Sequence, residues 1–463
     1  MLQKIKICFT MLCLLSTLGI RAQQMVEPLP TPHQVAWQEM ETYAFIHYGL
    51  NTYTDKEWGY GDADPQVFNP QKLDCEQWVR VLQKGGMKGV ILTAKHHDGF
   101  CLWPTKYTDY NITASPFRGG KGDLVKELCE ACRKYGMKFG LYLSPWDRHQ
   151  ATYGSPAYVE YYNRQLEELL TQYGPLFEIW FDGANGGDGW YGGANEKRNI
   201  DRGTYYNFPN LFQKVRKYQP QTIIFSDGGP GCRWVGNEDG FAGETNWAFL
   251  RGKEVYPGYP KYQELPNGHA DGYQWTAAEC DVSIRPGWFY HDQENDKVKT
   301  PETLREIYYK SVGRNATMLL NVPVNKDGLI SAVDSAHLVN FAELIRRDFQ
   351  NNLLGKGRMK KKDFVEGGVP CQEIICKLRG KQTVNCLMLG EDIATGQRVN
   401  RFSVEYKTKN GGMPVDCQEE MTTIGYKRII RFENIQTKQL RIVLRSRKGA
   451  PIINKVGGYL VNS

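Results

Sequence analysis

The sequence lacks most of the motifs by which nucleotide-binding, metal-dependent and nucleic-acid-binding proteins are recognised. No GxGxxG or P-loop segment directly follows a strand-like run, which argues against a nucleotide-binding α/β sheet. There is no HxH or HExxH pair, and Cys129 and Cys132 form the only CxxC, so the ligand pairs typical of zinc sites are missing. The formal net charge of +7 is spread thinly and forms no basic stripe, so nucleic acid is not an expected partner.

Long apolar runs are also lacking, apart from one near the N-terminus. Residues 7–20 are mostly apolar, follow a short basic segment and precede Arg21-Ala22-Gln23, a pattern typical of a secretory signal peptide. The run is too short to predict a membrane span, and no later stretch could form one. We therefore expect residues 1–22 to be removed and the protein to be exported, to the periplasm or the extracellular space.

A regular spacing of cysteines is also lacking. Of the twelve cysteines, Cys8 and Cys13 lie in the leader and the other ten are irregularly spaced. Export permits disulfides, but a domain of this size does not need them. We expect most of these cysteines to be buried free thiols.

What the sequence does have is a regular alternation of strand-like and helix-like segments. At 463 residues the chain exceeds the usual size of one core, so we expect one large and one smaller domain. The predicted strands are 43–47, 89–97, 139–144, 177–182, 222–227 and 316–322, and the predicted helices are 75–84, 124–134, 158–172 and 210–217. Such alternation predicts an α/β fold, a parallel (β/α)8-like TIM barrel over residues 30–350.

The pattern changes after the glycine-rich segment Leu354-Gly355-Lys356-Gly357. Short strand-like segments such as 373–378, 402–407 and 439–444 are separated by turns. This pattern predicts a C-terminal β-sandwich over residues 355–463. It could be a carbohydrate-binding module or a domain that only packs against the barrel.

The most informative predicted strand ends in a carboxylate. In Phe177-Glu178-Ile179-Trp180-Phe181-Asp182 the three apolar residues alternate with Glu178, Trp180 and Asp182. Side chains of a strand alternate between two faces, so an apolar outer face and a polar inner face are expected here. Barrel enzymes carry their chemistry at the C-terminal ends of the strands, which makes Asp182 the first candidate for a catalytic nucleophile.

Polar groups also replace aliphatic ones at three other strand ends. His47 ends one strand, His96 and His97 end a second, and Tyr142 and Ser144 face inward on a third. Four such ends in succession favour a ligand site, because buried polar groups need partners. His96 and His97 reach one ligand only if the strand has already turned into a loop, as Asp98-Gly99 indicates. We expect these residues to bind sugar hydroxyls rather than a metal.

A second acid is expected in the segment that follows residues 222–227. We interpret Cys232-Arg233-Trp234-Val235-Gly236-Asn237-Glu238 as a loop that brings an arginine, a tryptophan and a carboxylate together. Glycoside hydrolysis usually needs a second carboxyl group to protonate the leaving oxygen. Glu238 is the first candidate for that role, with Glu244 and Glu279 as rivals.

At this point the sequence resembles a known family. The matching stretches are Phe45-Ile46-His47-Tyr48-Gly49, Glu57-Trp58, Lys95-His96-His97-Asp98-Gly99-Phe100, Tyr142-Leu143-Ser144, Trp180-Phe181-Asp182-Gly183 and Leu319-Leu320-Asn321-Val322. In this order they resemble the family 29 glycoside hydrolases, the retaining α-L-fucosidases. Leu143-Ser144-Pro145-Trp146-Asp147-Arg148 and Arg233-Trp234-Val235-Gly236-Asn237-Glu238 resemble the subfamily that prefers branched α-1,3/1,4-linked fucose, as in Lewis-type glycans.

The resemblance implies roles for particular residues. Asp182 matches the nucleophile and Glu238 the acid/base of the branched-linkage subfamily, while Ala278-Glu279-Cys280 is similar to the acid/base segment of the other subfamily. The residues implied to surround the fucose ring are His47, Glu57, Trp58, His96, His97, Tyr142 and Arg233, and Trp146 adds a flat apolar face. The expected partners are fucosylated oligosaccharides or glycoconjugates, and neither a cofactor nor a metal is expected.

Three other functions remain open from the sequence. The barrel could remove a different sugar, since one fold hosts many chemistries. The protein could instead be a secreted glycan-binding protein with a degenerate site. A metal-dependent hydrolase is the third alternative.

Overall fold

The computed structural model describes residues 25–462, so the predicted leader at residues 1–22 lies outside the described residues. Eight parallel strands form a closed barrel in the order β1-β12-β11-β8-β7-β4-β3-β2. They are β1 (Thr42–Ile46), β2 (Gly89–Lys95), β3 (Lys138–Leu143), β4 (Glu178–Trp180), β7 (Ile223–Ser226), β8 (Cys232–Trp234), β11 (Ala277–Ser283) and β12 (Ala316–Asn321). The predicted barrel is confirmed, and all six predicted strands belong to it.

The sequence missed two of these strands. The segment interpreted as a loop from Cys232 onward begins with β8, which pairs in parallel with β7 and β11. β8 has only three residues, and β11 carries Glu279 and Asp281 on one face. Both therefore lack the apolar run by which a strand is recognised.

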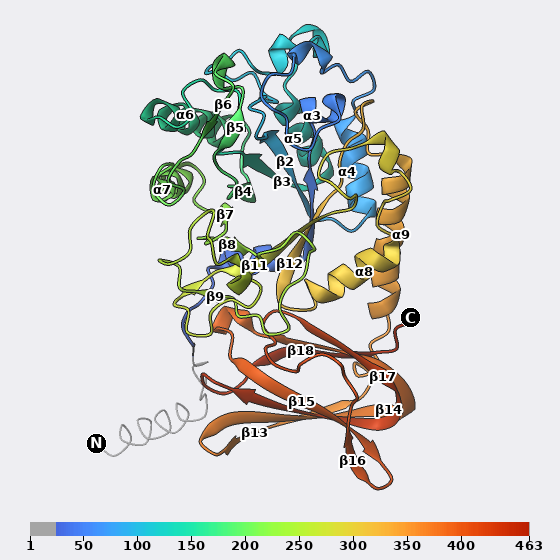
Figure 1. Cartoon of the computed structure of the whole chain (residues 1–463). Coiled ribbons are helices and arrows are strands. Elements are labelled where there is room, and N and C mark those ends of the chain that lie inside the picture. The colour runs from blue at the N-terminus through green and yellow to red at the C-terminus, as the bar shows by residue number, and fades with distance from the viewer. Residues whose placement is uncertain (1–24, 463) are drawn as a thin grey trace, which may run out of the picture.

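Helices cover the outside of the barrel (Figure 1). They are α4 (Cys75–Lys84), α5 (Leu124–Tyr135), α6 (Pro156–Gln172), α7 (Phe208–Tyr218), α8 (Pro301–Lys310) and α9 (Ala332–Phe349). Two of the predicted helices begin at aspartate caps, where Asp74 accepts from the backbone N–H of Gln77 and Asp123 from that of Lys126. Gly136 ends α5 with a φ of 68°, a conformation that glycine adopts without strain.

A short helix closes the N-terminal end of the barrel. α2 (Pro32–Gln38) places Gln34 Nε2 at 2.8 Å from the carbonyl oxygen of Gly231 and Trp37 Nε1 at 2.8 Å from Glu178 Oε2. Because this end is closed, access to the interior comes from the C-terminal ends of the strands. Further elements are α3 (Leu50–Thr54), the hairpin β5 (Gly187–Gly189) with β6 (Glu196–Arg198), and the pair β9 (Phe249–Leu250) with β10 (Gln274–Trp275).

The C-terminal domain is one antiparallel sheet below the barrel (Figure 1). Its strands are β13 (Arg358–Glu366), β14 (Val369–Glu391), β15 (Val399–Thr408), β16 (Gly411–Pro414), β17 (Arg428–Ser446) and β18 (Ile453–Tyr459). The predicted C-terminal β domain is confirmed; where the sequence predicted a β-sandwich, the strands form one antiparallel sheet, and the predicted short strands are parts of longer ones. β14 shifts register twice against β17, so its first half pairs with β13 and its second half with β18.

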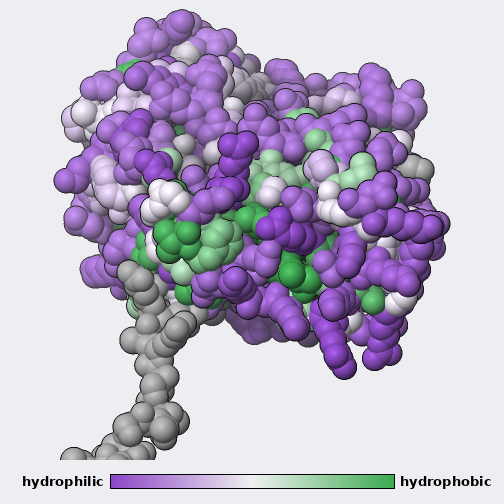
Figure 2. Space-filling view, turned by 90° about the horizontal axis from the view of Figure 1, so that it is seen from below, coloured by the Kyte–Doolittle hydropathy of each residue, from purple (hydrophilic) through white to green (hydrophobic). Residues whose placement is uncertain are grey.

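The C-terminal sheet is joined to the closed end of the barrel. The Nζ of Lys427 donates to Glu41, and Asn315 accepts from the backbone N–H of Tyr426 through its side-chain oxygen. Seen from below, the molecule shows mostly hydrophilic side chains with small hydrophobic areas between them (Figure 2). Among residues 25–462, no helix has the length and apolar character needed to cross a membrane.

Candidate active site

Asp182 lies two residues beyond β4, at the open end of the barrel. Tyr142 of β3 donates its hydroxyl to Asp182 Oδ2 at 2.9 Å, and the backbone N–H of Ala184 donates to Oδ1 at 2.6 Å. The side chain keeps 23% of its surface exposed, so a substrate can reach it. Phe181 points outward and packs against Phe208 of α7, as the predicted alternation requires.

His97 faces Asp182 from the turn after β2. Ser144 donates its hydroxyl to the carbonyl oxygen of Trp146 at 2.7 Å, so its oxygen accepts from Nδ1 of His97, also at 2.7 Å. This arrangement fixes the tautomer and leaves His97 Nε2 directed at Asp182, 3.9 Å from Oδ2. The turn predicted at Asp98-Gly99 is present, with φ of 84° at Gly99.

His47 and His96 complete a group of three histidines with His97. Asn321 of β12 donates both amide hydrogens, to Ser283 and to the carbonyl oxygen of Trp288, so its oxygen accepts from Nδ1 of His47 at 2.9 Å. The rings of His96 and His97 lie 4.1 Å apart. Nδ1 of His96 is buried and has no hydrogen-bond partner within residues 25–462.

Burial keeps these three imidazoles neutral. It lowers the pKa of His47 to about 3, and the pKa values of His96 and His97 are lowered in the same way. For His97 the negative charge of Asp182 opposes the effect of burial without overcoming it. The rings are therefore uncharged. His47 and His97 already donate through Nδ1, so their Nε2 atoms are left as acceptors for sugar hydroxyls.

Aromatic rings form the walls of the site. The ring of Trp58 lies 5.3 Å from His97 and 5.6 Å from Trp146, both edge-on, and Trp58 is 53% exposed. On the other side Trp288, which follows β11, lies 5.1 Å from His47. The sequence analysis did not identify Trp288. The signal was the pair of aromatic residues in Arg285-Pro286-Gly287-Trp288-Phe289, which follows the end of β11.

Glu57 anchors the Trp288 segment. Its carboxylate accepts from the backbone N–H groups of Trp288 and Phe289, at 2.7 and 3.1 Å, and from Nε2 of His291 at 2.8 Å. A side chain on Gly287 would collide with this carboxylate, since an added Cβ would lie 2.3 Å from Oε1. Glu57 therefore stands at the predicted site and also holds one of its walls.

Glu238 lies on the Trp288 side of the mouth, in the loop after β8. The indole N–H of Trp288 is 3.3 Å from Glu238 Oε2. Partial burial of the carboxyl raises the pKa of Glu238, and the negative charges of Asp182 and Glu57 raise it further. The residue as a whole is exposed, so its carboxyl group meets solvent.

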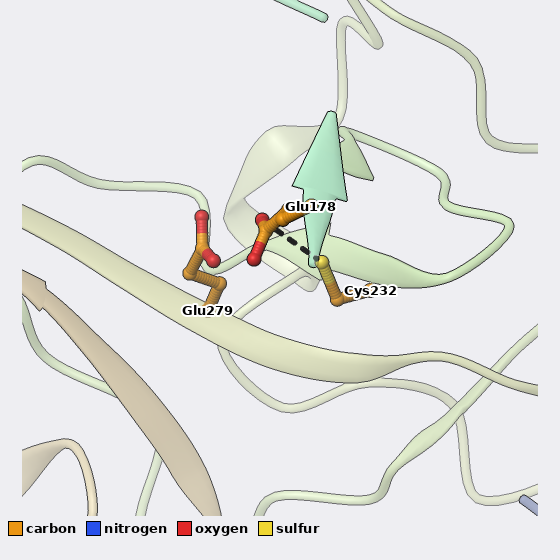
Figure 3. Close-up of side chains that lie close together, drawn as sticks. All are labelled: Glu178, Cys232 and Glu279. Carbon is orange, nitrogen blue, oxygen red and sulfur yellow. Dashed lines mark hydrogen bonds between the residues drawn. The ribbon is translucent and has the colours of Figure 1, made fainter. Parts of the chain in front are cut away.

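Glu279 lies inside the barrel, below the mouth. It accepts from the indole N–H of Trp180 at 2.7 Å and from the hydroxyl of Tyr43. Glu178 points toward Glu279 and Cys232 (Figure 3), and the ligand atoms of these three residues lie within 4.8 Å of one another. Burial raises the pKa of both glutamates, and no cationic side chain among residues 25–462 contacts them, so we infer that the pair is held neutral or shares one proton.

The structure does not bring Glu244 or Arg233 to the site. Glu244 contacts Arg314 and accepts from the backbone N–H of Glu420, at the junction with the C-terminal domain. Arg233 is on β8 between two inward-facing residues, so its own side chain points out of the barrel. Its guanidinium donates to the carbonyl oxygens of Leu265 and Thr276 and to Asn246.

A further carboxyl group lies beside Asp182. Asp227, at the end of β7, accepts from the backbone N–H groups of Gly258 and Tyr259 at 2.7 and 3.3 Å. Burial raises the pKa of Asp227 to about 7, and the charge of Asp182 contributes. The sequence marked Asp227 as a strand end, but nothing in it indicated that this carboxyl would lie next to Asp182.

A β/α barrel with carboxyl groups, neutral histidines and aromatic walls at its open end defines a class of protein, the barrel glycoside hydrolases. Comparisons with known proteins agree. The family model described as alpha-L-fucosidase matches residues 31–348. Alpha-L-fucosidase 1 of Arabidopsis thaliana is 41% identical over 460 residues, which cover 94% of this chain and 88% of that protein.

Solved structures agree as well. A glycoside hydrolase 29 family member from an unknown rumen bacterium is 47% identical with a TM-score of 0.89, covering 95% of this chain and 78% of that one. A glycoside hydrolase 29 fucosidase of Ruminococcus gnavus in complex with fucose is 30% identical with a TM-score of 0.82, covering 96% and 97%. The chain belongs to the α-L-fucosidase family, glycoside hydrolase family 29, and is an enzyme of that family.

We predict that the Glu178–Glu279 pair makes the free energy of unfolding fall at alkaline pH. Their folded pKa values lie above the ordinary value of 4.5, so the native state binds more protons than the unfolded state as pH rises above that value. Glu178→Gln supplies an amide N–H in place of the proton and should flatten this fall. Chemical denaturation between about pH 6 and 9 measures it, with Glu302→Gln on the surface of α8 as control. An equal slope in the wild type and Glu178→Gln contradicts the prediction.

Proposed function

We propose that the protein is an exo-acting, retaining α-L-fucosidase in which Asp182 is the nucleophile and Glu238 the acid/base. One observation carries this proposal: the carboxylate of Asp182 is fixed and reachable at the open end of the barrel, and its charge helps to raise the pKa of Glu238. A retaining mechanism needs one ionised and one protonated carboxyl group, roughly 5 Å apart. Glu279 and Glu244 are the less suitable acids, since one is enclosed in the barrel and the other lies at the domain junction.

The reaction proceeds by two displacements. An oxygen of Asp182 attacks the anomeric carbon, the glycosidic C–O bond breaks, and the proton of Glu238 passes to the departing oxygen. Glu238, now a carboxylate, takes a proton from water as the water oxygen attacks the same carbon. The bond to Asp182 then breaks, and fucose leaves with its original anomeric configuration.

The pocket around this carbon suits a deoxy sugar. Neutral His47, His96 and His97 offer ring nitrogens to the hydroxyl groups, and the hydroxyl of Tyr142 holds Asp182. Fucose carries a methyl group where many sugars carry a hydroxymethyl group, and the indole faces of the site can cover it. Trp58, Trp146 and Trp288 supply these faces, and Glu57 supports one of them.

We predict that Asp182→Ala lowers turnover of an aryl α-L-fucoside by about 10³-fold or more, because the covalent intermediate can no longer form. Substrate binding should persist. Azide should restore activity by attacking from the vacated face and giving the inverted fucosyl azide, which chromatography and NMR identify. Wild-type turnover in the variant, or retention of configuration in the azide product, contradicts the role of Asp182.

We predict that Glu238→Gln lowers kcat for a substrate with a poor leaving group by about 10²- to 10⁴-fold. A dinitrophenyl fucoside should lose far less in the first step, because its leaving group needs no proton. Glu244→Gln is the matched control and should behave as the wild type. If Glu279→Gln folds normally and shows the larger, leaving-group-dependent loss, the acid/base is Glu279 and the assignment to Glu238 is wrong.

We further propose a preference for α-1,3/1,4-linked fucose on branched glycans. The support is the resemblance at residues 143–148 and 233–238 together with the β5–β6 hairpin, which lies beside the Trp58 wall of the pocket because Arg148 donates to both. We predict release of fucose from Lewis-type trisaccharides at least about 10-fold faster than from linear 2′-fucosylated oligosaccharides, an order-of-magnitude discrimination typical of modest pocket contacts. Equal rates on both substrates in parallel digests would contradict this preference.

We propose that the protein is exported. The composition of residues 1–22 supports this, with basic residues followed by an apolar run. We predict that the protein accumulates outside the cytoplasm with Gln23 as its first residue, which N-terminal sequencing determines. A cytoplasmic protein that still begins at Met1 contradicts the proposal.

A further inference from the structure

We propose that Arg148 is a positioning residue that holds Trp58 in place as a wall of the sugar pocket. The inference rests on the proposed function only in that Trp58 contacts the substrate. Arg148 belongs to the loop after β3, and only 6% of it is exposed. No part of Arg148 contacts Asp182 or Glu238, so its effect must pass through its neighbours.

The guanidinium of Arg148 joins two other loops. Its Nη1 donates to the carbonyl oxygens of Trp58 and Gly59, at 3.2 and 2.8 Å. Its Nε and Nη2 donate to the backbone oxygen and to the side-chain Oδ1 of Asp188 in the β5–β6 hairpin, at 2.8 and 3.0 Å. The Trp58 loop and the hairpin are thus tied together through one planar group.

Arg148 is itself held firmly enough to serve as this tie. Its guanidinium carbon lies 5.1 Å from the ring centre of Tyr60 and 5.2 Å from that of Trp146. Its backbone N–H donates to the carbonyl oxygen of His97 at 2.8 Å, and its own carbonyl oxygen accepts from the N–H of Tyr191 at 2.8 Å. The backbone bond to His97 also links the tie to the histidine group.

Trp58 depends on such a tie because burial does not hold it. More than half of its surface is exposed, and its ring has edge-on contacts with His97 and Trp146. A ring fixed before the substrate arrives loses less conformational freedom on binding, and this strengthens binding. Arg148 fixes the backbone at Trp58, because it donates a hydrogen bond to the Trp58 carbonyl oxygen.

The expected effect of losing Arg148 is therefore on substrate binding. A lysine offers a point charge on a flexible stem and cannot satisfy four acceptors on two loops in one plane. The catalytic groups keep their partners, since Tyr142 and Ala184 hold Asp182 and Trp288 contacts Glu238. KM should rise while kcat changes little.

The test compares Arg148→Lys, Arg148→Ala, Trp58→Ala and the double variant Arg148→Ala/Trp58→Ala on an aryl α-L-fucoside. We expect each single variant to raise KM by about 10-fold, the order of effect that misplaced binding groups produce. The double variant should be no worse than Trp58→Ala, because both changes remove the same wall. Added guanidinium ion should lower the KM of Arg148→Ala, whereas it should leave the KM of Trp58→Ala unchanged.

Arg164→Lys on the exposed face of α6 is the matched control and should keep the wild-type KM and kcat. Arg148→Lys keeps the charge and most of the side-chain volume, so it serves if the alanine variant fails to fold. Additive effects in the double variant, or a fall in kcat at unchanged KM, overturn the role of Arg148. An unchanged KM in Trp58→Ala also overturns the role of Arg148, because it shows that Trp58 does not contact the substrate. The roles of Asp182 and Glu238 are tested separately by their own variants.

Discussion

Side chains alternate strictly between the two faces of the eight short parallel strands. This alternation decides which residues fill the inside of the barrel and which lie at its mouth. On β4 the inward positions are Glu178, Trp180 and then Asp182, so the same face that fills the interior also delivers the carboxylate to the open end. On β12 the inward Asn321 orients His47. α2 closes the N-terminal end of the barrel. Inward-facing residues at the C-terminal ends of the strands therefore meet solvent only through the mouth.

Low polarity inside the barrel sets the charges of the site. Burial keeps the histidines neutral, and it raises the pKa values of Glu178, Glu279 and Asp227 above those of ordinary carboxyl groups. Asp182 is reachable at the mouth, and a hydroxyl and a backbone N–H are directed at its two oxygens.

The side chains that form the walls of the mouth are held in place differently from those inside the barrel. Interior side chains are fixed by packing, whereas the exposed Trp58 and the half-buried Trp288 at the rim depend on hydrogen bonds to their backbone. Glu57 performs this task for Trp288, and Arg148 performs it for Trp58. Both anchors are charged groups with several hydrogen bonds, which are stronger and more directional than neutral ones.

Much of this could be predicted from the sequence. The periodicity of the apolar residues gave six of the barrel strands and four helices, and the polar ends of four strands pointed to Asp182, His47, His96, His97 and Tyr142. The two missed strands, β8 and β11, are short or carry acids inward, so their pattern is not that of a buried strand. Arg233 was misplaced for this reason, because a residue expected in a loop lies on a strand face that points outward.

By itself, the sequence determined the alternation of strands and helices and the identity of the groups at the strand ends, because periodicity and residue type are local properties. Only the tertiary structure decided which acid lies across the mouth from Asp182, since Glu238, Glu244 and Glu279 differ in burial and neighbours rather than in chemistry. It also decided which residues hold the walls, because hydrogen bonds such as those from Arg148 to Trp58 and Asp188 join loops far apart in the chain.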